Sequence, residues 1–170
     1  AILKKNVEIN NFKNIELYNY ALGSENKKVQ MILSDKIGEH RIYNEKSSHI
    51  SVNSDSTNEN TKLIEVNVVK LDDYVKTADF VKFDAEGYEI EILKGMPNLL
   101  KQNISLFSDF YVKLLKKNNK PDDFFDILSE NKFEFFDVRD NMKKTDKIKI
   151  LDKYNDKSGA TDILCTKIEI

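Results

Sequence analysis

The stretch that decides the fold is residues 80–95, FVKFDAEGYEIEILKG. An apolar run predicts a buried central strand over 79–84, and the isoleucines and leucine that follow predict a helix over 89–94. Asp84 and Glu86 stand between the two elements. In open α/β sheets, ligands bind where strands end and helices begin. We therefore expect the chemistry of this protein at these two carboxylates.

Strands and helices alternate through the second half of the chain, which predicts an α/β fold. We expect one domain over 1–170, with a polar surface loop or hairpin at 44–62 because that segment holds only Ile50 and Val52 as aliphatic residues. The predicted strands are 14–22, 29–33, 63–70, 79–84, 104–112, 133–138, 147–151 and 163–170. The predicted helices are 1–10, 71–75, 89–94 and one that opens at 121–123.

Composition argues against several classes of protein. The net charge is −2, from 29 acidic and 27 basic residues, so there is no electrostatic reason to expect nucleic acid as a partner. No apolar run reaches the length of a membrane span. Cys165 is the single cysteine, so no internal disulfide can form, and we expect a buried, inert thiol in a cytoplasmic protein.

Two further kinds of site are disfavoured. His40 and His49 flank the polar loop, and no cysteine or histidine stands at ligand spacing from them, so we expect no metal. No glycine-rich motif with lysine and serine or threonine is present to cradle phosphates, which argues against a nucleotide hydrolase.

The central stretch also resembles a known family. The pattern Lys82-x-Asp84-x-Glu86-Gly87-x-Glu89, with a Leu-Lys-Gly at 93–95 and a Leu-Asp-Asp-Tyr at 71–74, resembles the FkbM-type methyltransferases. Those enzymes depend on S-adenosylmethionine and have a Rossmann-like class I fold. Weaker similarities lie at 5–10, 19–23, 105–112 and 161–165.

The resemblance implies a mostly parallel sheet and methyl transfer to a hydroxyl of a glycan or small metabolite. Asp84 and Glu86 would align or deprotonate that hydroxyl. Their structural alternative is to cap the following helix through its free N–H groups. By the same resemblance, Ala21 and Leu22 would contact the adenine of the cofactor, or form an ordinary turn with Gly23.

Other polar residues of the stretch are expected to have lesser roles. Asp109, on the next predicted strand, either binds the substrate or lies at a solvated edge. Glu89 and Glu91 are expected to be solvated on the helix. Lys82 is expected to be structural and Gly87 to serve the geometry of the turn.

One departure from the family concerns the first part of its fold. The family begins with a glycine-rich loop, whereas Gly23 is the first glycine here, and Ala1 already stands in a helical pattern. We expect a chain that lacks the first two strands, binds S-adenosylmethionine weakly, and leaves the strand ending at Ala21 without a neighbour. Either the native polypeptide continues upstream of Ala1 and supplies both strands with the glycine-rich loop, or the 170-residue chain self-associates or repacks along the bare edge at 80–84. The alternative function is a non-catalytic interaction or structural module.

Overall fold

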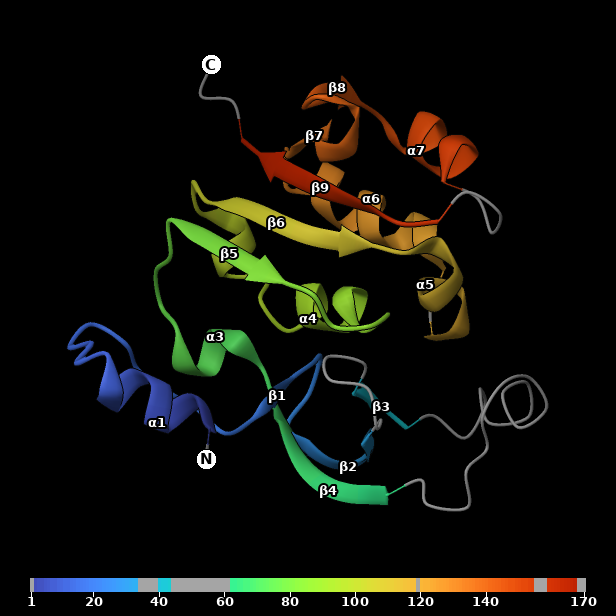
Figure 1. Ribbon diagram of the computed structural model, residues 1–170. Coiled ribbons are helices and arrows are strands. Elements are labelled where there is room, and N and C mark those ends of the chain that lie inside the picture. Colours follow the sequence, from blue (N-terminus) through green and yellow to red (C-terminus); the bar gives the residue numbers. More distant parts are fainter. Residues whose placement is uncertain (1, 34–39, 44–61, 119, 155–158, 168–170) are drawn as a thin grey trace.

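The computed structural model describes residues 2–33, 40–43, 62–118, 120–154 and 159–167. Its helices are α1 (Ile2–Ile9), α3 (Leu71–Tyr74), α4 (Glu89–Lys94), α5 (Val112–Asn118), α6 (Pro121–Glu130) and α7 (Lys147–Lys153), with short 3-10 helices η1 (Leu99–Lys101) and η2 (Val138–Asp140). Its strands are β1 (Ala21–Leu22), β2 (Lys27–Leu33), β3 (Arg41–Ile42), β4 (Lys62–Val69), β5 (Phe80–Phe83), β6 (Ser105–Phe110), β7 (Glu134–Asp137), β8 (Lys143–Thr145) and β9 (Thr161–Thr166). The strands form two sheets (Figure 1).

The larger sheet has the strand order β5-β6-β9-β7-β8. Its strands β5 and β6 run parallel, whereas β9 lies antiparallel between β6 and β7, and β7 is antiparallel to β8. The expectation of a mostly parallel sheet is therefore wrong. The chain forms a mixed α/β structure, because β8 and β9 run opposite to β5, β6 and β7.

One face of the larger sheet is covered by helices and holds the core. Side chains alternate along the strands, so Phe110 of β6 and Phe135 of β7 point to this face and are buried. The rings of Phe124 and Phe125 in α6 lie 5.2 and 5.1 Å from the ring of Phe110. Helix α6 begins at Pro121, whose fixed φ suits the first helical position.

The opposite face of the larger sheet is open. Register places Lys82, Phe107, Leu164 and Phe136 in one row across β5, β6, β9 and β7. Lys82 is exposed and the three apolar side chains are partly buried. Strand β5 lies at the end of the sheet, and Phe80 on it is 55% exposed. In the described part of the chain, no second strand pairs with β5.

The smaller sheet has the order β1-β4-β2-β3, and β1 pairs in parallel with β4. The expectation that the strand ending at Ala21 lacks a neighbour is therefore wrong. That strand is also much shorter than predicted, since only Ala21–Leu22 pair. Ile15 and Leu17 formed the apolar side of the alternating pattern. They are 43% and 41% exposed, so this side is not buried against the rest of the protein.

The smaller sheet meets the end of helix α4 at a pair of glycines. Gly23 follows β1 and donates its N–H to the carbonyl of Val69 over 3.0 Å. Gly95 ends α4 with an ordinary φ of −86°, yet a Cβ there would collide with the carbonyl oxygen of Gly23. Position 95 therefore requires glycine, because the backbones of Gly95 and Gly23 lie too close together for a side chain. Ser24 donates a hydrogen bond to Glu91 and strengthens the same junction, so Glu91 is only partly solvated.

Residues 147–151 form part of helix α7, so the strand predicted there is wrong. Ile148 and Ile150 alternate as in a strand, but Ile148 is 70% exposed and Ile150 is buried. The carboxylate of Asp146 accepts a hydrogen bond from the N–H of Lys149 over 3.0 Å and caps the helix. Ile150 and Tyr154, four residues apart, then share the buried face.

Two expectations concern regions or features beyond these elements. The polar loop predicted at 44–62 lies outside the described residues except for Lys62, which begins β4. Among the described residues, no helix is long and apolar enough to cross a membrane.

Candidate functional site

The turn after β5 places Asp84 at the carboxyl end of the strand. Glu86 and Gly87 have φ values of 52° and 94°, in the left-handed region that disfavours most side chains. A Cβ on Gly87 would also lie 2.7 Å from the carbonyl oxygen of Leu114. Gly87 therefore serves the backbone geometry of the turn, as predicted.

Glu89 is the residue that holds this turn, and the prediction that it is solvated is wrong. Its side chain is 2% exposed. Its Oε1 accepts hydrogen bonds from the N–H groups of Ala85 and Gly87 over 2.9 and 3.2 Å. Its Oε2 is buried and accepts no hydrogen bond from the described residues. The N-cap residue of α4 is Tyr88, and its side chain makes no capping hydrogen bond.

Burial raises the pKa of Glu89, and the nearby charge of Asp84 adds to the effect, while hydrogen bonds from the backbone oppose it. The folded protein therefore holds a proton on Glu89 more tightly than the unfolded chain does. The spacing of a capping box does not mark this role in the sequence, because Glu89 is the first residue of α4 and not its third. Its hydrogen bonds reach back to Ala85 and Gly87, within the turn.

Three aspartates lie in a row across three neighbouring strands. Asp109 of β6 stands directly opposite Asp162 of β9. On the other side, Phe83 pairs with Ser108, so the next residues, Asp84 and Asp109, are neighbours. Like charges on adjacent strands destabilise a sheet. The Nε of Arg139 lies 3.9 Å from Oδ2 of Asp162 and offsets part of this repulsion.

The surroundings of Asp109 strongly affect its carboxylate. Burial, followed by the charges of Asp84, Glu89, Asp162 and Glu86, raises the pKa of Asp109 to about 6. A carboxylate with that pKa can exchange a proton near neutral pH. The structure thus brings Asp109 beside Asp84, while its role toward a substrate stays a prediction.

The residues expected at the adenine, Ala21 and Leu22, lie in β1 of the smaller sheet and are partly buried. A Cβ on Gly23 would lie 2.6 Å from Cγ1 of Val68, so this glycine is needed for packing. The cofactor contact itself stays a prediction. Asp72, in the Leu-Asp-Asp-Tyr motif, accepts hydrogen bonds from the N–H groups of Asn98 and Leu99 over 2.7 and 3.1 Å. Asp72 therefore holds the first turn of η1.

The remaining candidates lie away from the turn or outside the described residues. Cys165 is buried in β9, and burial raises the pKa of its thiol, which disfavours the reactive thiolate. His40 is exposed, and His49 lies outside the described residues. In the part of the chain that the structure describes, no group of three His, Cys, Asp or Glu is arranged to hold a metal ion.

A cavity lies elsewhere, where η2, β8 and α7 meet. Most of its lining side chains are charged: Asp137, Asp140, Lys143, Lys144, Thr145, Lys149 and Lys153. Lys144, Lys149 and Lys153 each form an ion pair, with Glu134, Asp146 and Asp137 respectively. These lysines are engaged with carboxylates of the protein, so the cavity does not compete with the turn as a candidate site.

A family model for the methyltransferase FkbM domain matches residues 3–147. That span covers the strand, the turn with Asp84 and Glu86, the helix with Glu89, and Asp109. The chain belongs to the FkbM methyltransferase family. No curated protein and no solved structure matches it significantly. In this FkbM-family chain, the role of the acidic end of β5 and β6 stays a prediction.

Proposed function

We propose that this FkbM-family chain is an S-adenosylmethionine-dependent O-methyltransferase of the cytoplasm that acts on a hydroxyl of a glycan or small metabolite. The observation that carries the proposal is the pair of neighbouring carboxylates, Asp84 and Asp109, at the carboxyl ends of two parallel strands. A hydroxyl loses its proton when it receives a methyl group, and a carboxylate positioned beside it can accept that proton.

The acidic site suits the charge of the cofactor. When bound, S-adenosylmethionine supplies an electrophilic methyl group on a positively charged sulfur. Carboxylates favour a nearby cation, and this site gathers Asp84, Glu86, Glu89 and Asp109 within reach of one another's charges. Ala21 and Leu22 would hold the adenine, as the family implies.

Each residue of the turn has a distinct task in this proposal. Asp84 is exposed, orients the acceptor hydroxyl and takes its proton. Glu86 positions the acceptor, and its left-handed φ aims the turn. Glu89 keeps the turn in place through its two backbone hydrogen bonds. Because the geometry is set before the ligand binds, the site does not need to reorganise during the reaction.

Transfer of a labelled methyl group tests this function. The native polypeptide is incubated with S-adenosylmethionine labelled in its methyl group and a panel of hydroxyl-bearing sugars and metabolites. We expect label in a product that is stable to mild base, because an ether resists base and a methyl ester does not. Label confined to nitrogen or to carboxyl esters would contradict O-methylation.

The open edge of β5 favours a second candidate, a non-catalytic module that associates with its own copies. Bare, apolar strand edges recruit another strand, and Phe80 at this edge is 55% exposed. We expect the 170-residue chain to form dimers or larger species in sedimentation velocity, and Phe80→Lys to weaken them. Phe12→Lys, at a site 51% exposed outside both sheets, is the control. A chain that stays monomeric at high concentration would exclude this candidate.

A further inference from the structure

The acidic row at the end of β5, β6 and β9 points to the chemistry of the methyl acceptor. We propose that the acceptor carries a protonated amine, which Asp109 and Asp162 bind beside the hydroxyl that Asp84 addresses. That the bound molecule is a methyl acceptor rests on the proposed O-methyl transfer. The binding of the amine itself is a property of the site and can be measured without the cofactor.

The balance of charge gives the first argument. Five carboxylates act on one another here, since the charges of Asp84, Glu86, Glu89 and Asp162 all raise the pKa of Asp109. Arg139 supplies a positive charge near Asp162, at 3.9 Å. In the described part of the chain, Asp84 and Asp109 form no ion pair. A cation bound between Asp109 and Asp162 would relieve the repulsion between these two facing carboxylates.

Glu89 gives a second, independent argument. Its side chain is 98% buried, and its Oε2 accepts no hydrogen bond from the described residues. A buried carboxylate oxygen without a partner is costly unless the group takes up a proton or a positive charge compensates it. Glu89 lies close enough to Asp84 and Asp109 for their charges to interact. A cation bound at the row would therefore also stabilise the charged form of Glu89.

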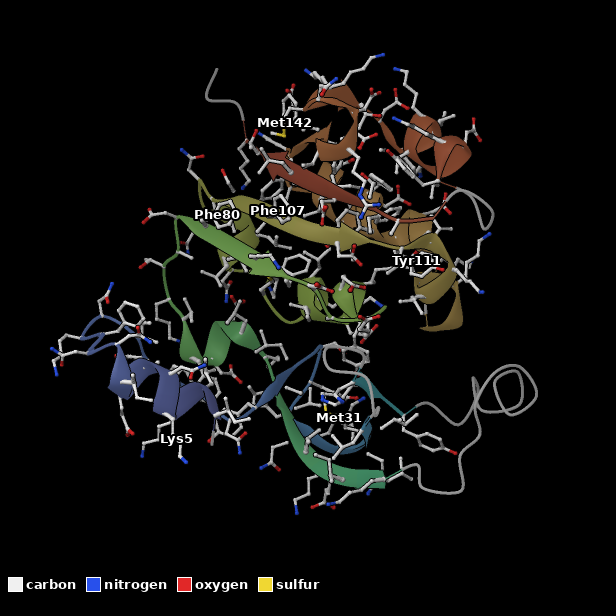
Figure 2. The ribbon with its side chains drawn as sticks, viewed as in Figure 1. Lys5, Met31, Phe80, Phe107, Tyr111 and Met142 are labelled. Atoms are coloured by element: carbon white, nitrogen blue, oxygen red, sulfur yellow. The ribbon has the colours of Figure 1, made fainter. Side chains whose placement is uncertain are left out.

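The neighbours of Asp109 favour an organic ammonium group over a metal ion. Side chains alternate along a strand, so Phe107 shares the open face of β6 with Asp109. Tyr111 lies just beyond the carboxyl end of the strand (Figure 2). Aromatic rings beside a carboxylate attract organic cations through their faces. In the row next to Asp109 and Asp162, Phe107, Leu164 and Phe136 offer an apolar surface to the carbon skeleton of such a ligand.

Binding of two sugars that differ only at the amine tests the proposal. Amide spectra of the ¹⁵N-labelled 170-residue chain are recorded at pH 7 during titration with glucosamine or with N-acetylglucosamine, whose nitrogen carries no charge. We expect glucosamine to bind at least about tenfold more tightly, the usual effect of a charge-assisted hydrogen bond, and to shift the amides of Asp109 and Asp162. Binding should weaken at pH 5, because Asp109, with its pKa of about 6, then takes up a proton.

Aspartate variants and a parallel titration with MgCl₂ test whether the two aspartates bind an amine or a metal ion. Asp109→Asn and Asp162→Asn should each abolish the preference for glucosamine, while Asp79→Asn, at the opposite end of β5, should keep it. The amide spectra of the variants show whether each is folded. Equal affinity for the two sugars, no saturable binding of glucosamine, or saturation by MgCl₂ in its place would overturn the proposal. A chain that binds glucosamine yet transfers no methyl group would contradict the proposed function and leave the amine site standing.

Discussion

Replacing Asp84 by asparagine should lower the rate of methyl transfer by a factor on the order of 10²–10⁴, the usual contribution of a positioned acid or base. Asparagine has nearly the same shape but cannot accept the proton of the acceptor hydroxyl. Because Asp84 is exposed at the end of β5, the fold should not change. The rate is measured with labelled S-adenosylmethionine on the native polypeptide, and folding by circular dichroism.

Asp79→Asn is the matched control for this experiment. Asp79 directly precedes β5 at the other end of the strand, and its backbone carbonyl accepts a hydrogen bond from Ser105 that the substitution leaves in place. We expect a normal rate in this variant. A normal rate in Asp84→Asn as well would assign Asp84 to structure and transfer the proton-accepting role to Asp109, whose pKa is raised to about 6.

Glu89→Ala should lower the free energy of unfolding by about 3 kcal/mol, the scale of hydrogen bonds to a charged group. The substitution removes the acceptor from the N–H groups of Ala85 and Gly87 and opens space inside the turn. Glu89→Gln keeps an oxygen for both N–H groups and removes the charge. We expect this variant to lie within about 1 kcal/mol of the original protein at neutral pH, since shape and hydrogen bonds are kept.

The pH dependence separates the two effects of Glu89. Because burial raises its pKa, the stability linked to its bound proton is present at low pH and is lost as pH rises through the raised pKa. Denaturant unfolding should therefore show Glu89→Gln gaining stability relative to the original protein as pH rises above the ordinary range of a glutamate. Glu130→Gln, at the exposed end of α6, should show no such trend. If the free energies of unfolding of Glu89→Gln and Glu130→Gln changed with pH in the same way, burial would not raise the pKa of Glu89.

Local pattern determined several elements correctly. The apolar run and the turn residues of 80–95 specify β5, the acidic turn and α4, because a strand of period two and a helix of period 3.6 bury different spacings of apolar residues. Pro121 and the aspartates after it mark the start of α6 for the same local reason. The place of Asp84 and Glu86 between β5 and α4 could also be predicted, and so could the family, since both depend on a contiguous motif.

Tertiary contacts decided the rest. Ile148 and Ile150 fit a strand as well as a helix, and the burial of Ile150 with Tyr154, together with the cap from Asp146, selects the helix. The helix α5 and the strand β8 were not predicted, because their apolar patterns are short and their partners lie elsewhere in the chain. Strand direction is equally nonlocal, so the antiparallel place of β9 between β6 and β7 could not be deduced from its own residues.

The candidate site shows the same division. Sequence alone determined that Asp84 and Glu86 end a strand before a helix, because that depends on neighbours in the chain. It could not determine that Asp109 and Asp162 lie opposite each other, 53 positions apart, because register is set by the packing of whole strands. It also could not show Glu89 to be buried. Helical spacing gives the face on which a carboxylate lies, whereas the folded chain around it decides whether that face meets water.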